Sequence, residues 1–360
     1  MKAYSCLMVI ALLAACLWSC KKDSSPKNTG TNGTTGTTGA TGTGSTTDTT
    51  KTTLKTDVYY VGFLNKNQTT GGNRAELWKN GVLTSLSNII SSASNIWVSK
   101  GNTYVCGYEG IAVSTHAVYW KNFNYSTPLT DGSEYRSIAN DITVQDSDVL
   151  CVGDVIDHTG YKAVFWRNQK MTVLTNNGDA SRILVKGSDI YIAGAYTDAK
   201  GNSFACYWKN GIVHKLSARA QATGIAIDDN SNIYVCGTQN NSPIYWKNDV
   251  MTALPKTTKL AFANAITTKG DDVYIVGSGE DDPYWGYNHA YCWKNGIPQD
   301  FSGGSEADDI TIVGTHIFIA GSHAAGLNKY GRLWEDTLIA YLDPYGLTSV
   351  FNGLYIDQHY

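Results

Sequence analysis

The sequence predicts an all-β fold, a seven-bladed β-propeller built from four-stranded antiparallel blades. A unit of about 40 to 47 residues recurs seven times from residue 56 onward, a spacing typical of propeller blades. Each unit contains short apolar runs separated by turn residues, and each places one tryptophan at an equivalent position. These tryptophans are Trp78, Trp120, Trp166, Trp208, Trp246, Trp293 and Trp334.

The residue pattern of each unit predicts four strands, which we call a, b, c and d in chain order. Strand a carries Ala-x-x-Ile, and strand b ends in glycine, as in Tyr104-Val105-Cys106-Gly107. Strand c ends at the repeat tryptophan, and strand d follows a turn such as Lys79-Asn80-Gly81. Val, Ile and Tyr favour strands, a terminal glycine permits a bulge, and Asn-Gly favours a tight hairpin.

The repeat frame is offset from the end of the chain. The first b strand, near Val58, has no a strand before it, whereas residues 351–356 form an a-like strand after the last unit. We expect these two strands to pair, because pairing closes the ring and removes two free sheet edges. The C-terminal strand therefore completes the first of seven blades.

Two c strands are preceded by His-Ala, namely His116-Ala117-Val118-Tyr119-Trp120 and His289-Ala290-Tyr291-Cys292-Trp293. With the Ala-x-x-Ile and glycine-ended strands, they resemble the His-Ala-Phe-x-Trp units of HAF-type extracellular repeats and, more distantly, kelch blades. The double glycine of kelch blades is absent. The resemblance implies a repeat scaffold of secreted or surface proteins, which is architecture and location rather than chemistry.

The N-terminal residues predict a signal peptide. The charged Lys2 precedes an apolar run over residues 3–18, which is short for a membrane span. Leu17-Trp18-Ser19-Cys20 resembles a bacterial lipoprotein box in the style of Bacteroidota, and Leu13-Ala14-Ala15-Cys16 is a rival box. We favour Cys20 because Lys21 ends the apolar run directly after it; an uncleaved helical anchor is the other alternative.

This assignment implies a lipoprotein acylated on Cys20 with palmitate-type chains, held at the outer membrane or cell surface. Residues 1–20 form the signal peptide, residues 21–55 a Thr/Gly-rich disordered tether and residues 56–360 the propeller. The membrane lipid anchor is one partner, and we expect the propeller to be a monomer.

Composition narrows the class of protein. A net charge of -3 and 16% charged residues argue against nucleic-acid binding. Of the eight cysteines, three lie in the signal region, and the others occupy strand positions where other units have small or apolar residues. We therefore expect buried thiols rather than disulfides. No Cys/His spacing suggests a metal, and no motif suggests a cofactor.

The b–c connections differ from unit to unit, so binding is expected on the face that they share. The richest spans residues 279–289, where aromatic rings suited to a sugar face or a protein side chain stand beside carboxylates. Its candidate ligand-binding residues are Asp281, Asp282, Tyr284, Trp285, Tyr287 and His289. Alternatively this loop is clamped onto the neighbouring blade, or Glu280, Asp281 and Asp282 hold Ca²⁺.

A second candidate site is the mouth of the central channel on the same face. The two positions before the Ile of strand a are polar in most units, and they include Asp141, Arg182, Asp308 and Asp309. One arginine among carboxylates suits a small polar ligand. Alternatively these residues are solvated caps at the starts of the strands.

No motif identifies an enzyme. Phosphate loops, nucleophile elbows and metal triads are absent from the sequence, and no spacing assembles the loop histidines into an acid/base set. We expect a surface-anchored, noncatalytic propeller that binds a glycan or a protein partner. The alternatives are a propeller-type hydrolase or lyase acting on extracellular polysaccharide, and a purely structural surface protein.

Overall fold

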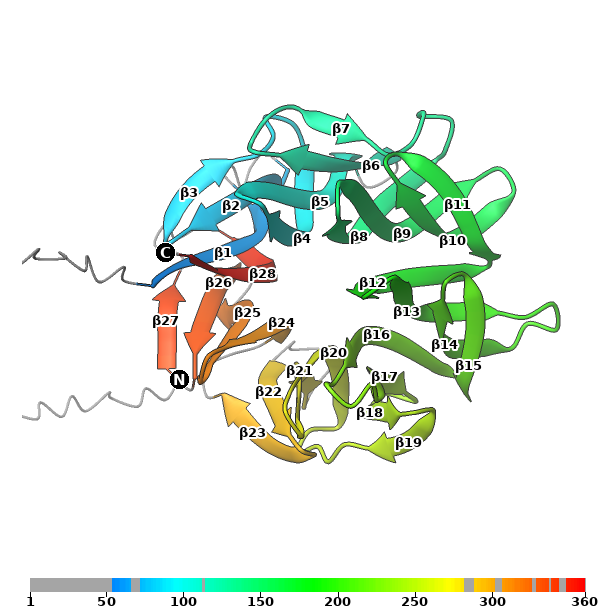
Figure 1. Cartoon of the computed structure of the whole chain (residues 1–360), viewed down its shortest axis with the longest axis vertical. Helices are drawn as coiled ribbons and strands as arrows, with labels where there is room; N and C mark the ends of the chain where they lie inside the picture. The colour runs from blue at the N-terminus through cyan, green and yellow to red at the C-terminus, as the bar shows by residue number, and fades with distance from the viewer. Residues whose placement is uncertain are drawn as a thin grey trace, which may run out of the picture. The chain divides into compact units, whose positions relative to one another are not determined.

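The computed structural model describes residues 54–65, 72–111, 114–281, 288–301, 306–325, 328–336, 338–342 and 348–359. Residues from Thr52 to Tyr360 form one compact unit. Its described strands make seven four-stranded antiparallel sheets in a ring, which confirms the predicted seven-bladed propeller (Figure 1). No helix long and apolar enough to cross a bilayer occurs in the part of the chain that the structure describes.

We call the sheets blades A to G and give their strands from the channel outward, in the order a, b, c, d. Blade A contains β28 (Ser349–His359), β1 (Lys55–Leu64), β2 (Arg74–Lys79) and β3 (Val82–Ser85). Blade B contains β4 (Ser91–Ser99), β5 (Asn102–Ile111), β6 (Ser114–Lys121) and β7 (Ser126–Pro128). Blade C contains β8 (Arg136–Gln145), β9 (Asp148–Asp157), β10 (Gly160–Arg167) and β11 (Lys170–Asn176).

Blade D contains β12 (Gly178–Lys186), β13 (Asp189–Thr197), β14 (Ser203–Lys209) and β15 (Ile212–Ala218). Blade E contains β16 (Ala220–Ile227), β17 (Ile233–Gln239), β18 (Ser242–Lys247) and β19 (Val250–Ala253). Blade F contains β20 (Leu260–Lys269), β21 (Asp272–Glu280), β22 (Asn288–Lys294) and β23 (Ile297–Phe301). Blade G contains β24 (Glu306–Val313), β25 (His316–Ala325), β26 (Asn328–Glu335) and β27 (Leu338–Leu342).

The C-terminal strand closes the ring as the sequence predicted. β28 pairs antiparallel with β1 along its whole length, from Lys55 opposite His359 to Leu64 opposite Ser349. The blue and red ends of the propeller therefore meet in one blade (Figure 1). The Phe351 ring packs against Tyr60 and Trp78, with ring centroids 4.6 Å and 4.8 Å apart. Burial of these rings ties the two chain segments together.

The hydrophobic core is divided among the seams between neighbouring blades. All seven repeat tryptophans are at most 1% exposed. One cluster, for example, joins Val61 and Leu77 of blade A to Ile96 and Trp120 of blade B. The five cysteines of the propeller are buried and free, which confirms that they are thiols within the core. Each blade thus buries a tryptophan that it could not bury alone.

The Lys-Asn-Gly turns form tight hairpins and also fix the start of strand b. Asn80 has a φ of 50° and Gly81 a φ of 80°, the left-handed values that this turn requires. The Asn80 side-chain oxygen also accepts a hydrogen bond from the Val58 N–H, at 2.8 Å. Equivalent bonds occur in all seven blades, accepted by Asn80, Asn122, Asn168, Asn210, Asn248, Asn295 and Asp336.

Every inner strand has a bulge at the same place, directly after the repeat alanine in blades B to G and after Phe351 in blade A. In blade C, Ala139 lies opposite Gly153 and Asp141 lies opposite Val152, so Asn140 is the extra residue. The backbones approach so closely that a Cβ on Gly153 would lie 2.0 Å from the Ile138 carbonyl oxygen. This explains the glycine at the matching position of each b strand, although the strand continues past it. The seven bulged residues are Ser94, Asn140, Ser181, Thr223, Asn264, Asp308 and Asn352.

The b–c connections contain more strand than the sequence predicted. In blade B, β5 continues to Ile111 and β6 starts at Ser114, and in blade C only His158 and Thr159 join β9 to β10. Cross-strand pairing at this end satisfies backbone groups that a loop would leave to water. Much of the variable face is therefore made of projecting hairpins.

Candidate functional site

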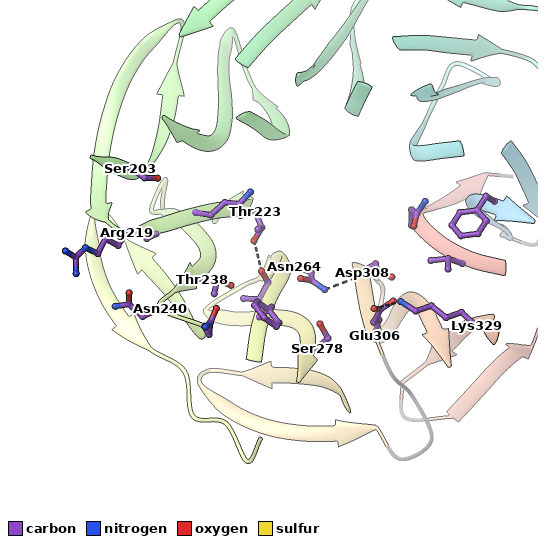
Figure 2. Close-up of a pocket in the computed structure, with 18 residues that line it drawn as sticks. Ser203, Arg219, Thr223, Thr238, Asn240, Asn264, Ser278, Glu306, Asp308 and Lys329 are labelled. Atoms are coloured by element: carbon purple, nitrogen blue, oxygen red, sulfur yellow. Dashed lines mark hydrogen bonds and ion pairs between the residues drawn. The ribbon is translucent and has the colours of Figure 1, made fainter. Parts of the chain in front are cut away.

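A cavity of about 1060 Å³ opens where the central channel meets the face that carries the b–c connections. We call it the mouth cup (Figure 2). Its wall is formed mainly by the bulged inner strands β16, β20, β24 and β28, and by the adjoining ends of b strands. The lining combines amides and hydroxyls with the rings of Phe63 and Phe262 and with four ionisable groups, Arg219, Glu306, Asp308 and Lys329.

Each repeat has two positions that frame the bulge, and in blades A, E and F both of them line the cup. They are the residue before the repeat alanine and its cross-strand partner after the repeat glycine. Alanine and glycine are nearly constant, but these partners differ in every blade. The seven pairs are Val350 and Phe63, Ser92 and Tyr108, Ile138 and Asp154, Asp179 and Ala195, Gln221 and Thr238, Phe262 and Ser278, and Glu306 and Ser322. Sequence reasoning missed them, although variable positions beside fixed ones were a visible signal.

The bulged residues mainly connect neighbouring blades. Asn264 Nδ2 donates to the carbonyl of Ala307 in the next blade at 3.0 Å, and Asn352 Nδ2 donates to that of Ala93 at 2.7 Å. Asn140 and Thr223 make the same contact with the repeat alanine of the blade that follows. Side-chain donors at this position thus stabilise the blade seams around the mouth.

Asp308 breaks this pattern because it carries a carboxylate where other blades have a donor. Its Oδ2 is buried without a hydrogen-bond partner, and its Oδ1 lies 3.5 Å from Asn264 Nδ2 (Figure 2). Burial raises the pKa of Asp308, and the nearby Glu306 carboxylate raises it further. Glu306 itself pairs with Lys329 Nζ at 2.6 Å and accepts a hydrogen bond from Ser322. Asp308 is therefore the polar group of the cup that is least satisfied by the protein.

Arg182 crosses the channel one residue deeper than the bulge. Its Nη2 donates to Asp309 Oδ1 at 3.1 Å and to the Asp308 carbonyl at 3.3 Å. These residues belong to blades D and G, and three steps is the largest separation possible in a ring of seven. The equivalent positions of blades E, F and A hold the small residues Gly224, Ala265 and Gly353.

Asp141 and Asp309 flank this arginine. Asp141 accepts hydrogen bonds from Asn95 Nδ2 at 2.6 Å and from the Ile183 N–H at 2.8 Å. Burial raises the pKa of Asp141 to about 6 and also raises the pKa of Asp309. Burial alone would lower the pKa of Arg182, but the two carboxylates outweigh it and raise the pKa. The structure thus places three of the candidate ligand-binding residues in a buried charge layer beneath the cup.

The remaining candidates are only partly described. Asp281 and His289 are brought together, with 3.2 Å between Asp281 Oδ2 and His289 Nε2, at the b–c end of blade F. Neither residue lines the mouth cup, although Ser278 of the same blade does. Asp282, Tyr284, Trp285, Tyr287 and the predicted acylation site Cys20 lie outside the described residues.

Comparisons with known proteins support the propeller fold. The sequence profile of a family described as a beta-propeller repeat matches residues 216–245. No curated protein matches the chain. Among solved structures, the chain is similar to a puromycin-hydrolyzing peptidase of Mycobacterium tuberculosis, with 10% identity and a TM-score of 0.52. The match covers 81% of this chain and 51% of the peptidase, so the chain spans about half of that protein.

Two further structures are similar at a coarser level. The β-propeller domain of the trilobed protease from Pyrococcus furiosus is 12% identical, with a TM-score of 0.45 over 79% of this chain and 95% of that domain. A Trypanosoma rangeli sialidase in complex with sialic acid is 6% identical, with a TM-score of 0.49 over 77% of this chain and 59% of the sialidase. The fold and the mouth define a seven-bladed β-propeller with a nonrepeating polar cup.

Proposed function

We propose that this protein is a noncatalytic binding propeller that takes a glycan in the mouth cup. The observation that carries the proposal is the cup lining, in which amide and hydroxyl groups alternate with two phenylalanine rings. A sugar ring has hydroxyls that both donate and accept hydrogen bonds, which Gln221, Asn264 and Ser278 can match. It also has an apolar C–H face, which suits Phe63 and Phe262. A volume of about 1060 Å³ is ample for a small ligand.

Binding is favoured over hydrolysis by the state of the carboxylates. Glycoside hydrolysis generally needs two carboxyl groups, one to protonate the leaving oxygen and one to act on the sugar or on water. The raised pKa of Asp308 favours the protonated carboxyl that a general acid needs. Glu306, however, is engaged by Lys329 and Ser322, so it is poorly placed for a second role. A propeller-type hydrolase or lyase is the second candidate on the strength of Asp308.

Surface display is the second part of the proposal. β1 begins at Lys55 beside the c–d turn of blade A, where Lys79 pairs with Asp57. This end of strand b lies on the opposite face from the b–c connections and the cup. A lipid anchor on Cys20, reached through residues 21–55, would therefore join the propeller on the face away from the cup. The HAF-type resemblance supports the same extracytoplasmic location.

A glycan array probed with the purified full-length chain, combined with an assay for new reducing ends, tests the binding function. We expect binding without product. Gln221→Ala and Phe262→Ala should lose binding, whereas Gln358→Ala, an exposed change at the end of β28 on the opposite face, should retain it. Released sugar would support the hydrolase instead, and an array without any signal would contradict glycan binding.

Metabolic labelling with a fatty acid analogue tests the anchor. We expect Cys20→Ala to abolish labelling, because no other residue then carries the diacylglycerol. Labelling that persists in Cys20→Ala and disappears in Cys16→Ala would place the lipid on the rival box.

A further inference from the structure

A second hollow lies between blades A and B, on the outer part of the propeller. This lateral groove has a volume of about 770 Å³ and shares no lining residue with the mouth cup. One wall is the segment that joins β3 to β4, residues 86–90, and the other is the turn that joins β6 to β7. The groove is therefore a separate feature and not an extension of the cup.

Three large apolar side chains border the groove in an exposed state. Tyr125 is 99% exposed, Ile89 is 49% exposed and Phe123 is 44% exposed. Single exposed apolar residues are common and need no explanation. Three of them around one polar groove, with a tyrosine ring that the protein hardly covers, are typical of a recognition surface.

The turn that presents these rings is strained. Phe123 has a φ of 62° at the position where blades A, D and F have glycine, with φ values from 80° to 82°, and where blades C and E have Gln169 and Asp249, with φ values of 70° and 69°. A bulky side chain disfavours this conformation. The turn is also longer, because β7 starts six positions after Trp120, whereas β3 starts four positions after Trp78. The positive φ belongs to the repeat, and blade B differs from the other blades with a non-glycine residue there by carrying a bulky aromatic side chain.

The floor of the groove holds an oriented carboxylate. Glu109 Oε1 accepts a hydrogen bond from Ser87 Oγ on one wall, and Glu109 Oε2 accepts one from Ser126 Oγ on the other, both at 2.7 Å. The side chains of Arg74 and Asn88 line the groove beside it. An exposed ring thus stands next to fixed hydrogen-bonding groups from both blades.

We propose that the lateral groove is a second carbohydrate site that holds a sugar ring of a polysaccharide against Tyr125. The apolar face of the sugar packs on the tyrosine ring, and its hydroxyls bond to Glu109, Arg74 and Asn88. This inference rests on the glycan-binding function proposed for the mouth cup. Two sites on one rigid domain strengthen the capture of a long polymer through avidity, but they do not strengthen binding of a short oligosaccharide at the cup.

Affinity electrophoresis of the full-length chain tests the groove, with native gels that contain xylan, mixed-linkage β-glucan, galactomannan or pectin. We expect Tyr125→Ala to weaken retardation by the recognised polymer at least about tenfold, through lost avidity. Its affinity for a tetrasaccharide of the same linkage should change less than twofold, because the cup is intact. The matched control is Tyr135→Ala, which removes a 60% exposed tyrosine outside the groove and should behave like the parent.

A second variant separates binding from folding. Phe123→Gly removes a groove ring and relieves the strained φ, so we expect weaker retardation together with a higher melting temperature. A purely structural turn would gain stability without losing retardation, which would overturn the inference.

The outcomes also separate the two sites. Retardation of Tyr125→Ala equal to the parent in every gel, with loss in Gln221→Ala, would overturn the groove and keep the cup. Loss in Tyr125→Ala with full retardation of Gln221→Ala would overturn the cup and keep the groove. Both sites would be overturned if none of the gels retarded the parent protein, or if the partner that it binds proved to be a protein and not a polysaccharide.

Discussion

Arg182 and Asp309 form an ion pair across the channel, 3.1 Å from Nη2 to Oδ1, although 127 positions separate them in the chain. The two side chains are only 17% and 12% exposed. This contact joins blades D and G directly, although they are not neighbours in the ring. It therefore makes the ring rigid beneath the mouth cup.

Removal of the arginine is expected to be costly. Arg182→Met leaves Asp309 and Asp141 buried without a counter-ion, so we expect a loss of about 3 to 5 kcal/mol in the free energy of unfolding. Chemical denaturation measures it. The double variant Arg182→Met with Asp309→Asn should recover part of the loss, since it removes one uncompensated charge. A single variant as stable as the parent would show that the bridge is dispensable.

Asp308→Asn is expected to stabilise the propeller. An asparagine at this bulge would donate to the next blade, as Asn140, Asn264 and Asn352 do, for about 1 kcal/mol. The raised pKa of Asp308 means that its folded form holds a proton which the unfolded chain releases near pH 4. The parent therefore loses stability as pH rises above about 4, and the advantage of the variant should grow. Denaturation midpoints at pH 4, 6 and 8 test this; an advantage that shrinks with pH would contradict the assignment.

Truncation before Phe351 is expected to abolish cooperative folding. It removes most of β28, exposes the edge of β1 and uncovers the rings of Tyr60 and Trp78. Thermal unfolding followed by circular dichroism, with light scattering for aggregation, is the measurement. Deletion of His359 and Tyr360 alone is the control and should melt like the parent. A truncated protein with the parent's transition would mean that β28 does not close the ring.

Relief of strain in blade B is expected to add stability. Phe123→Gly should raise the free energy of unfolding by about 1 kcal/mol, because glycine adopts positive φ without a Cβ clash. The reciprocal change Gly211→Ala, at a turn glycine with φ of 82° and open space around it, should cost a similar amount. Destabilisation by Phe123→Gly would instead show that the ring packs against the groove wall.

The sequence by itself determined the framework because the framework repeats. The spacing of the tryptophans, the Asn-Gly turns and the Ala-x-x-Ile strands each mark one structural role seven times, so local chemistry and periodicity suffice to infer blades. The offset of the repeat frame also determined how the ring closes. The first b strand lacks an inner partner and the C-terminal a-like strand lacks a blade, so these two strands pair with each other. The same frame placed Asp308 and Arg182 at the channel mouth.

Only the tertiary structure decided which of these residues bind each other and which remain available to a ligand. The partner of Arg182 depends on which blade lies across the ring. Whether a polar residue ties two blades without lining the cup, as Asn140 does, or lines the cup, as Gln221 does, depends on a one-residue bulge that reverses the alternation of faces. The lateral groove needs Ser87, which follows the last strand of blade A, to meet Glu109 of blade B. Such contacts arise from ring closure and packing between distant segments, which local sequence patterns do not encode.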